Sequence, residues 1–273
     1  MSLHNKTAFI TGATRGIGKA IALRIAKDGG NVVIAAKSVE ENPKLGGTIF
    51  SAAKEIEEAG GKALAVQCDI RFEDQVQAAV DKAIAQFGGI DIVVNNASAI
   101  SLTPTEQTEP KRFDLMHDIN VRGTFFVTKA CIPHLKKSSN AHILTLSPPI
   151  NLNPKWFGGH VAYTVTKYSM SMMAIGWAAE LKQYRIASNA LWPRTTIDTA
   201  AVRNLLGGEA LAKMSRTPDI LADAVYCILN KPAADCTGNC FIDEEVLAKE
   251  GITDLSHYSV VPGANLYRDL FVD

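Results

Sequence analysis

Short apolar runs alternate with helical patterns along almost the whole chain, and this alternation constrains the fold more than any other feature. The runs typical of strands are Thr7–Ile10, Asn31–Ala36, Ala63–Cys68, Ile90–Val94, His142–Leu146, Ile186–Leu191 and Asn239–Ile242. The segments of helical period are Ile17–Ala26, Thr48–Ala59, Glu73–Phe87, Lys111–Leu135, Tyr163–Lys182 and Pro218–Leu229. Runs that are apolar on both faces indicate a parallel sheet covered by helices on both sides. The order predicts an α/β fold with a doubly wound, parallel seven-stranded sheet.

One domain accounts for the 273 residues, because the sequence shows no internal repeat and no linker-like tract. We predict a single domain over residues 1–273, with residues 244–273 as a C-terminal extension beyond the last strand. A second irregular stretch, Ser38–Gly47, forms a turn-rich loop after the second strand. Loops at strand ends are where such sheets bind ligands.

Charge and cysteine content argue against several classes of protein. The 28 basic residues balance 28 acidic ones, so the basic footprint of nucleic-acid binding is missing. No apolar run approaches the roughly 18 residues of a membrane span. A strand-like run already begins at Thr7, so we expect no signal peptide. The sequence ends without a peroxisomal signal. We expect a cytoplasmic protein with neither nucleic-acid nor membrane partners. Cys236 and Cys240 lack the further ligands of a zinc site, so we expect no metal.

A glycine-rich loop joins the first strand to the first helix. Glycines there permit a tight turn, let the backbone approach a pyrophosphate and allow the helix to pack closely on the strand. The helix N-terminus then attracts the phosphates, which makes the sheet one of the Rossmann type. A turn that merely needs small residues, or the similar turn of methyltransferases, remains an alternative. The candidate cofactor-binding residues of the loop are Gly12, Ala13, Thr14, Arg15, Gly16, Ile17 and Gly18.

The end of the second strand indicates which nicotinamide cofactor binds. NAD-binding proteins place an acidic residue there for the ribose 2′-hydroxyl, whereas this chain has Lys37. Lys37 and Arg15 would attract a 2′-phosphate, so we predict NADP(H). The alternative is that Lys37 is a solvated lysine. Asp69, which ends the third strand, is placed to meet the adenine edge or to cap the following turn.

Tyr163 and Lys167 form a candidate catalytic pair, because residues four apart lie on one face of a helix. Lowering the pKa of a tyrosine from about 10 to near 7 requires about 4 kcal/mol. A lysine ammonium about 4 Å away supplies roughly that amount at an effective dielectric constant of about 20. Tyr163 is therefore the predicted proton-transfer residue. A surface pair on an amphipathic helix is the alternative.

The motifs TGATRGIG, NNAS and YTVTK, together with Asn120, resemble the short-chain dehydrogenase/reductase superfamily over the whole chain. The resemblance implies an oxidoreductase that interconverts a carbonyl and an alcohol. It implies that Tyr163 exchanges a proton with the substrate oxygen and that Lys167 bonds the nicotinamide ribose and lowers the tyrosine pKa. Asn120 would anchor a water molecule between Lys167 and solvent, and Asn95 would support the sheet behind the nicotinamide.

The sequence departs from this family at the catalytic serine. Ile150 stands where that serine usually lies, and the usual Ser-Ser pair reads Ser147-Pro148. Ser147 is the candidate catalytic serine, and Asn151 or Asn153 would replace it if its hydroxyl does not reach the substrate. Two further departures concern glycines of the family pattern. Ser98 replaces the glycine of the usual NNAG motif, and the chain reads Trp192-Pro193-Arg194 where a Pro-Gly pair is usual.

The substrate cleft is expected to lie between residues 150–157 and 198–211. The candidate apolar residues of this cleft are Ile100, Leu102, Ile150, Trp156, Phe157 and Trp192. In the alternative interpretation they pack in the core or at a subunit contact. An apolar cleft favours a lipophilic small-molecule substrate. A cofactor-binding sensor or scaffold of low turnover is the alternative function.

Association into a homodimer or homotetramer is also expected. The helix that begins near Tyr163 carries Met170, Met172, Met173, Ile175 and Trp177 on more than one side. More than one face of that helix should then be buried, and packing against a second copy would bury both.

Overall fold

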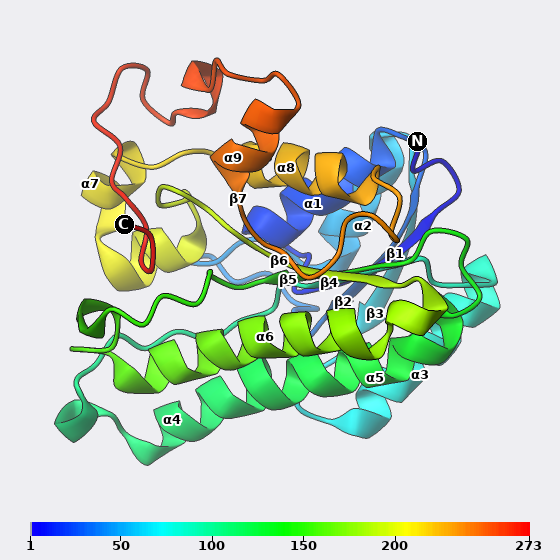
Figure 1. The fold of residues 1–273 in the computed structure, drawn as a ribbon, viewed down its shortest axis with the longest axis horizontal. Helices are drawn as coiled ribbons and strands as arrows, with labels where there is room; N and C mark the ends of the chain where they lie inside the picture. Colours follow the sequence, from blue (N-terminus) through cyan, green and yellow to red (C-terminus); the bar gives the residue numbers. More distant parts are fainter. Residues whose placement is uncertain (1) are drawn as a thin grey trace.

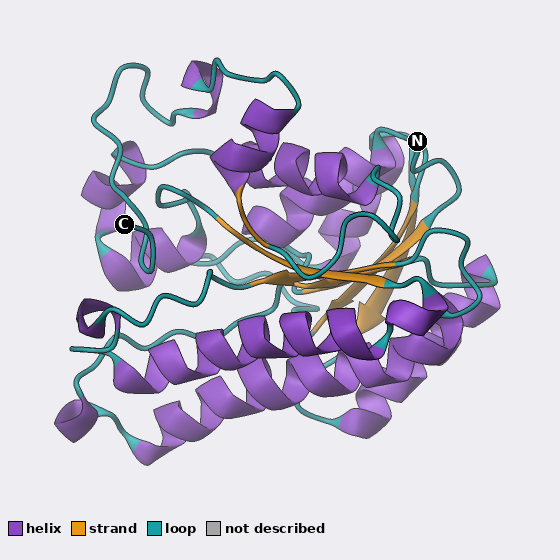
Figure 2. Cartoon of the chain, viewed as in Figure 1, coloured by secondary structure: helices purple, strands orange, loops and turns teal. Residues whose placement is uncertain are grey.

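A seven-stranded parallel sheet lies between two layers of helices in the computed structural model, which describes residues 2–273 (Figure 1, Figure 2). The strands are β1 (Thr7–Thr11), β2 (Asn31–Ala36), β3 (Lys62–Gln67), β4 (Ile92–Asn95), β5 (His142–Leu146), β6 (Ala187–Trp192) and β7 (Cys240–Ile242). Their order across the sheet is β3-β2-β1-β4-β5-β6-β7, and every neighbouring pair is parallel. The predicted doubly wound sheet is confirmed.

The strand order places a crevice at the centre of the sheet. From β1 the chain moves outward through β2 to β3, and then crosses back to place β4 on the other side of β1. The loops that leave β1 and β4 therefore diverge above the carboxyl ends of these two strands. Such a switch point is where open α/β sheets bind their ligands.

The helices divide between the two faces of the sheet (Figure 2). One face is covered by α1 (Gly16–Ala26), α2 (Ile49–Glu58), α8 (Asp219–Leu229) and α9 (Asp243–Lys249), and the other by α3 (Glu73–Phe87), α5 (Thr124–Leu135) and α6 (Val161–Glu180). Consecutive residues of β1 point to opposite faces, so Ile10 packs in the first layer and Phe9 in the second. Strands with two buried faces explain the continuous apolar runs of the sequence.

The predicted helix Lys111–Leu135 is divided in the structure. It consists of α4 (Pro110–Met116), a π-helical turn over His117–Gly123 and α5. The turn carries Asn120, and single π-helical turns inside α-helices are frequent at functional sites. Two further helices, α7 (Gly208–Lys213) and α9, lie in stretches for which the sequence pattern predicted no helix.

Two properties of residues 2–273 limit the kinds of site they form. None of their helices combines the length and the apolar character that a membrane crossing requires. No three of their histidine, cysteine, aspartate and glutamate side chains gather in a group able to hold a metal ion.

Candidate active site

The glycine loop has the backbone geometry that the sequence predicted. Gly12 and Gly16 have positive φ values of 69° and 55°, which side chains other than glycine rarely adopt. Gly18 is constrained by packing, since a Cβ atom there would lie 2.5 Å from the Nδ2 atom of Asn96 and 2.8 Å from the carbonyl oxygen of Gly12. The loop is therefore built for a close approach between α1, β1 and the loop after β4.

The start of α1 suits an anionic group such as a pyrophosphate. Helix α1 begins at Gly16 with no side-chain cap and no acidic residue in its first turn. Its first backbone N–H groups and its positive dipole end thus remain available to an anion. Ala13 and Thr14 are buried beneath the turn, whereas Ile17 reaches the main cavity. These residues fit the phosphates of a dinucleotide.

A cationic group lies beside the loop where an adenosine ribose would be recognised. The guanidinium of Arg15 donates a hydrogen bond from its Nη2 atom to the Ser38 hydroxyl (2.7 Å), and its buried Nε atom has no partner within the described chain. Lys37 follows β2 and is exposed. Two positively charged side chains thus lie at this strand end, and no acidic residue directly follows the strand.

Asp69 is held by Arg71, which the sequence interpretation did not single out. The Arg71 guanidinium donates to both carboxylate oxygens at 2.6–3.1 Å, and its backbone N–H donates to Oδ1 at 3.2 Å. The side-chain hydrogen bond from Arg71, more than the nearby charge of Lys37, holds the pKa of Asp69 below its usual value. The turn role that the sequence allowed for Asp69 is present in the structure, and Arg71 adds a third cationic side chain at this end.

The main cavity lies over the carboxyl ends of β1, β4, β5 and β6 and has a volume of about 650 Å³. It begins at Ile17 and Asn96 beside the glycine loop and extends to Tyr163, Lys167 and Trp192. The predicted pair thus lines one cavity with Ile17 of the glycine loop. This arrangement can hold a dinucleotide and a small substrate side by side.

Tyr163 and Lys167 project from α6 into this cavity, and both are buried. The ammonium of Lys167 donates to the carbonyl oxygen of Leu146 (2.6 Å) and lies 5.0 Å above the Trp192 ring. The Tyr163 hydroxyl makes no hydrogen bond to residues 2–273 and is not one of their fully buried unpaired groups, which fits its place on the cavity wall. It is therefore free to bind a substrate oxygen.

The expectation that the pKa of Tyr163 is lowered was wrong for the protein chain without a cofactor. Burial raises the pKa of Tyr163 above its ordinary value, with a smaller contribution from the charge of Asp269. Burial also lowers the pKa of Lys167 to about 7, and Asp269 opposes that shift. The cost of removing the charged forms of both side chains from water therefore dominates in this cavity.

Asn120 and Asn95 are buried and hold the framework of the site. The Asn120 side chain uses both donors and both acceptor directions: it binds the N–H and C=O groups of Ala99 and the hydroxyls of Ser98 and Thr166, at 2.8–3.1 Å. The amide of Asn95 donates to Thr128 on α5 (3.0 Å). A water molecule bound at Asn120 would therefore have to use its backbone, because the side chain is fully engaged.

Asn96 is a further site residue that the sequence interpretation did not single out. Its amide donates to the carbonyl oxygens of Thr11 (2.8 Å) and Gly12 (3.1 Å), and its backbone N–H donates to the Thr11 hydroxyl (3.0 Å). Asn96 thus connects the loop after β4 to the glycine loop across the crevice. Its place in the NNAS motif was visible in the sequence, but the contact with the glycine loop was not.

The structure does not bring the Ser147 hydroxyl to the cavity. Ser147 follows β5 and is 1% exposed, and its hydroxyl is buried with no hydrogen-bond partner within the described chain. Leu146, and not Ser147, belongs to the cavity wall. Asn151 and Asn153, the predicted replacements for Ser147, make other contacts. The side chain of Asn151 binds Asp273, and that of Asn153 caps the short helix that begins at Pro154.

The residues expected to form the substrate cleft line the main cavity on one side only. Ile100, Leu102 and Trp192 line the cavity, and residues 199–211 form much of its roof. Ile150, Trp156 and Phe157 instead pack around Tyr163, Tyr168 and Phe271, as the alternative interpretation held. The roof lies against the cofactor end, because Asn204 donates to the carbonyl oxygen of Lys44 (3.1 Å).

The C-terminal segment closes the side that residues 150–157 were expected to form. Figure 1 shows this segment, in red, returning to the side of the sheet where α7 lies. Residues Tyr267–Leu270 line the cavity, and Phe271 packs against the ring of Tyr163 with 6.2 Å between centroids. Only the tertiary structure reveals this wall, since the sequence of the segment carries no motif.

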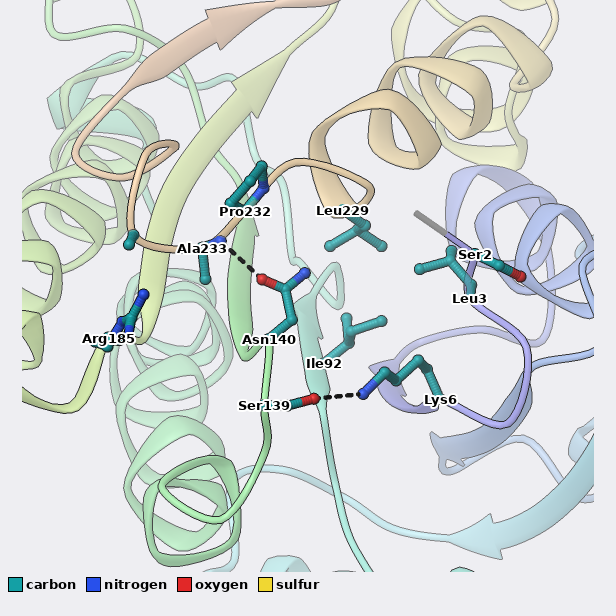
Figure 3. Close-up of a pocket in the computed structure, with 11 residues that line it drawn as sticks. Ser2, Leu3, Lys6, Ile92, Ser139, Asn140, Arg185, Leu229, Pro232 and Ala233 are labelled. Atoms are coloured by element: carbon teal, nitrogen blue, oxygen red, sulfur yellow. Dashed lines mark hydrogen bonds between the residues drawn. The ribbon is translucent and has the colours of Figure 1, made fainter.

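Another cavity, of about 350 Å³, lies at the opposite end of the strands (Figure 3). Its residues include Leu3, Lys6, Ile92, Asn140 and Arg185, near the amino ends of the strands. None of the catalytic candidates lines it. The chemistry that the sequence predicts therefore belongs to the main cavity.

The fold and the main cavity define a nicotinamide-dependent oxidoreductase class: a glycine loop at the switch point of a doubly wound sheet, with a buried tyrosine and lysine on one helix. Residues 6–209 match the short chain dehydrogenase family. The chain therefore belongs to this family, as the sequence motifs predicted.

Individual relatives support the same assignment. The chain is 62% identical over 267 residues to "Hydroxysteroid dehydrogenase-like protein 2" of Xenopus tropicalis and 58% identical to the Homo sapiens protein of that name. These alignments cover 98% of this chain but 63% of those relatives' length.

Solved structures resemble the whole chain. A putative dehydrogenase from Xanthomonas campestris has a TM-score of 0.97 at 55% identity, with all of both chains covered. A short chain dehydrogenase from Mycobacterium thermoresistibile has a TM-score of 0.94 at 58% identity, covering all of this chain and 96% of the other. The fold of the described residues is thus that of established short-chain dehydrogenase structures.

Proposed function

We propose that this protein is an NADP(H)-dependent oxidoreductase that interconverts a carbonyl and an alcohol on a lipophilic small molecule. The observation that carries this proposal is the placement of Tyr163 and Lys167 in one cavity that reaches Ile17, at the end of the glycine loop. The hydroxyl of Tyr163 is free of protein partners, so it can bind the reacting oxygen. The apolar residues of the wall, among them Leu102, Trp192 and Leu206, favour a lipophilic substrate.

The residues of the chain would divide the work as follows. The loop Gly12–Gly18 and the start of α1 hold the pyrophosphate, and Lys167 holds the nicotinamide ribose. When bound, the cofactor supplies or accepts the hydride, which no side chain can do. Tyr163 gives a proton to the substrate oxygen during reduction and takes it back during oxidation. Asn95, Asn96 and Asn120 fix the loops that shape the site.

Arg15 and Lys37 support the preference for NADP(H). Arg15 is positioned by Ser38, and Lys37 stands where an acidic residue would bind the ribose of NAD. Among structures of similar fold, a metagenomic short-chain oxidoreductase at 26% identity (TM-score 0.73) is in complex with NADP. A 3-ketoacyl-(acyl-carrier-protein) reductase from Brucella melitensis at 30% identity is complexed with NADH. The fold accepts either cofactor, so the preference rests on the local charges.

A second copy of this chain is the proposed partner. Val161, Val165, Met172 and Ile175 of α6 are between 41% and 56% exposed, and Phe125 of the neighbouring α5 is 45% exposed. These side chains form the outer apolar face of the α5–α6 pair. Met170 and Trp177 are buried on the inner side, so the helix has the two apolar faces that the sequence predicted. Packing of this face against a second copy would remove it from water.

Binding and turnover experiments test the proposed function. We expect NADPH to raise the melting temperature more than NADH and S-adenosylmethionine to have no effect. Loss of NADPH absorbance with a panel of lipophilic aldehydes, ketones and 3-oxoacyl compounds then measures reduction. The buried Ser147 hydroxyl favours one alternative, a cofactor-binding protein of low turnover. Tight NADPH binding without turnover on any compound of the panel would support that alternative.

A further inference from the structure

Asp269 is an acidic side chain in the catalytic cavity to which the proposed mechanism assigns no role. It comes from the C-terminal segment and, among the described residues that line the cavity, it is the only acidic one. The cavity wall also carries Tyr163 and Lys167, and Asp269 acts electrostatically on both. A half-buried carboxyl group on the wall of this cavity, beside the catalytic pair, calls for a functional explanation.

The backbone around Asp269 is fixed on both sides. The N–H group of Asp269 donates to the carbonyl oxygen of Arg194 (3.1 Å), and the Trp192 indole donates to the carbonyl oxygen of Leu270 (2.9 Å). The same Trp192 ring lies 5.0 Å from the Lys167 ammonium. The Asp269 carboxyl is therefore held in the neighbourhood of Lys167 by contacts that do not depend on its own charge.

Phe271, two residues after Asp269, packs the C-terminal segment against α6. Phe271 is 1% exposed, and its ring lies within 6.2 Å of the rings of Trp156, His160, Tyr163, Tyr168 and Trp192. Its backbone adopts φ 70°, an unfavourable conformation for an aromatic residue. The strain is accepted because the aromatic cluster fixes the chain on both sides of the turn.

The charged groups around Asp269 act on it in opposite directions. Burial raises the pKa of Asp269 to about 7, and Asp243 at the start of α9 adds to this effect. Lys167 lowers it. Arg268 lines the same cavity, and the His160 ring lies 6.0 Å from that of Phe271. Since Lys167 is the cation that stabilises the carboxylate, the two groups stabilise each other's charged forms.

We propose that Asp269 is a positioning residue that favours the charged form of Lys167, the form on which the proposed carbonyl reduction depends. A carboxylate favours an ammonium over an amine, whereas burial by itself keeps Tyr163 protonated. In reduction Tyr163 loses its proton to the substrate oxygen, and the hydride comes from the reduced cofactor. Asp269 itself exchanges no proton with the substrate. The consequence for turnover rests on the proposed function, whereas the coupling to Lys167 does not.

Titration of Lys167 by NMR in protein carrying ¹³Cε-labelled lysine tests the coupling without any substrate. Lys167→Met identifies its signal. Asp269→Asn keeps the shape and the oxygen that accepts from the Leu270 N–H (2.6 Å) but removes the charge. We expect the Lys167 midpoint to fall, by up to about one pH unit, because an opposite charge in the same cavity is lost. Asp254→Asn removes an exposed charge of the same C-terminal extension and should leave the midpoint unchanged.

An unchanged Lys167 midpoint in Asp269→Asn would overturn the proposal, and so would an equal shift in Asp254→Asn. Should Asp269→Asn not fold, Asp269→Ser gives the same test, because its hydroxyl can also accept from the Leu270 N–H. Asp269→Glu retains the charge and should restore most of the wild-type midpoint.

The pH profile of reduction supplies a second test once a substrate is known. Above its raised pKa the Asp269 side chain is a carboxylate, whereas below it the side chain is mostly neutral, like the asparagine of the variant. We expect kcat/KM of Asp269→Asn to fall at pH 8, by up to about tenfold for a shift of about one pH unit in Lys167, and to change little at pH 6. An equal loss at both pH values indicates a structural role and contradicts the proposal. Full activity of Tyr163→Phe would instead overturn the proposed function and leave the NMR result standing.

Discussion

Replacing Tyr163 by phenylalanine should separate catalysis from folding, because the structure gives its ring and its hydroxyl different surroundings. The ring is 4% exposed and packs against Phe271, and the substitution keeps this packing. The hydroxyl has no hydrogen-bond partner among residues 2–273, so its removal leaves no buried group unpaired. We expect the free energy of unfolding to change by less than about 1 kcal/mol.

Turnover should respond far more strongly. The negative charge that develops on the substrate oxygen needs a proton donor, and positioned donors contribute about 10²–10⁴-fold. We therefore expect kcat for carbonyl reduction to fall at least about a hundredfold, equivalent to about 2.7 kcal/mol of transition-state stabilisation. NADPH affinity should barely change, since Tyr163 acts on the transition state.

Tyr168→Phe provides the matched control on the same helix. Its hydroxyl donates to the carbonyl oxygen of Asn151 (2.6 Å) and does not line the cavity. This variant should lose about 1 kcal/mol of stability and keep its turnover. The measurements are NADPH oxidation with a working carbonyl substrate, thermal unfolding and NADPH titration. Full activity of Tyr163→Phe on such a substrate would refute the mechanism, whatever the fold.

Three further predictions concern the cofactor, the serine and the partner. NADPH should bind more tightly than NADH in calorimetry, and Lys37→Asp should reverse that order because the new carboxylate repels a 2′-phosphate. If Lys37→Asp leaves the ratio of the two affinities unchanged, the cofactor assignment is wrong. Ser147→Ala should keep turnover within about threefold, since its hydroxyl does not line the cavity, whereas a loss of tenfold or more would make it an oxyanion donor. Light scattering should show at least a dimer at micromolar concentration, and Met172→Asp with Ile175→Asp should dissociate it, because both side chains lie on the exposed face of α6. A wild-type protein that is monomeric at that concentration would disprove the association.

Local patterns determined the fold and the cofactor loop. The strands are apolar on both faces because both faces are buried, so their runs stand out in the sequence, and the parallel order follows from their alternation with helices. Gly12 and Gly16 require positive φ, a restriction that the sequence displays directly as glycine. The helical spacing of Tyr163 and Lys167 placed them on one face, and the structure confirms that both enter one cavity. The π-helical turn at Asn120 left no such signal.

What only the tertiary structure decided depends on contacts between residues distant in the sequence. Ser147 was a candidate by its position after a strand, but whether its hydroxyl faces the cavity depends on how the chain leaves β5, and it is buried instead. The sequence predicted that Lys167 lowers the pKa of Tyr163, yet burial outweighs that effect, and burial is a property of the packed molecule. Asp269 lies 102 positions after Lys167, and no periodicity or motif relates them. The return of the C-terminal segment over β6 brings that carboxyl to the lysine, because Trp192 and the cluster around Phe271 hold the segment there.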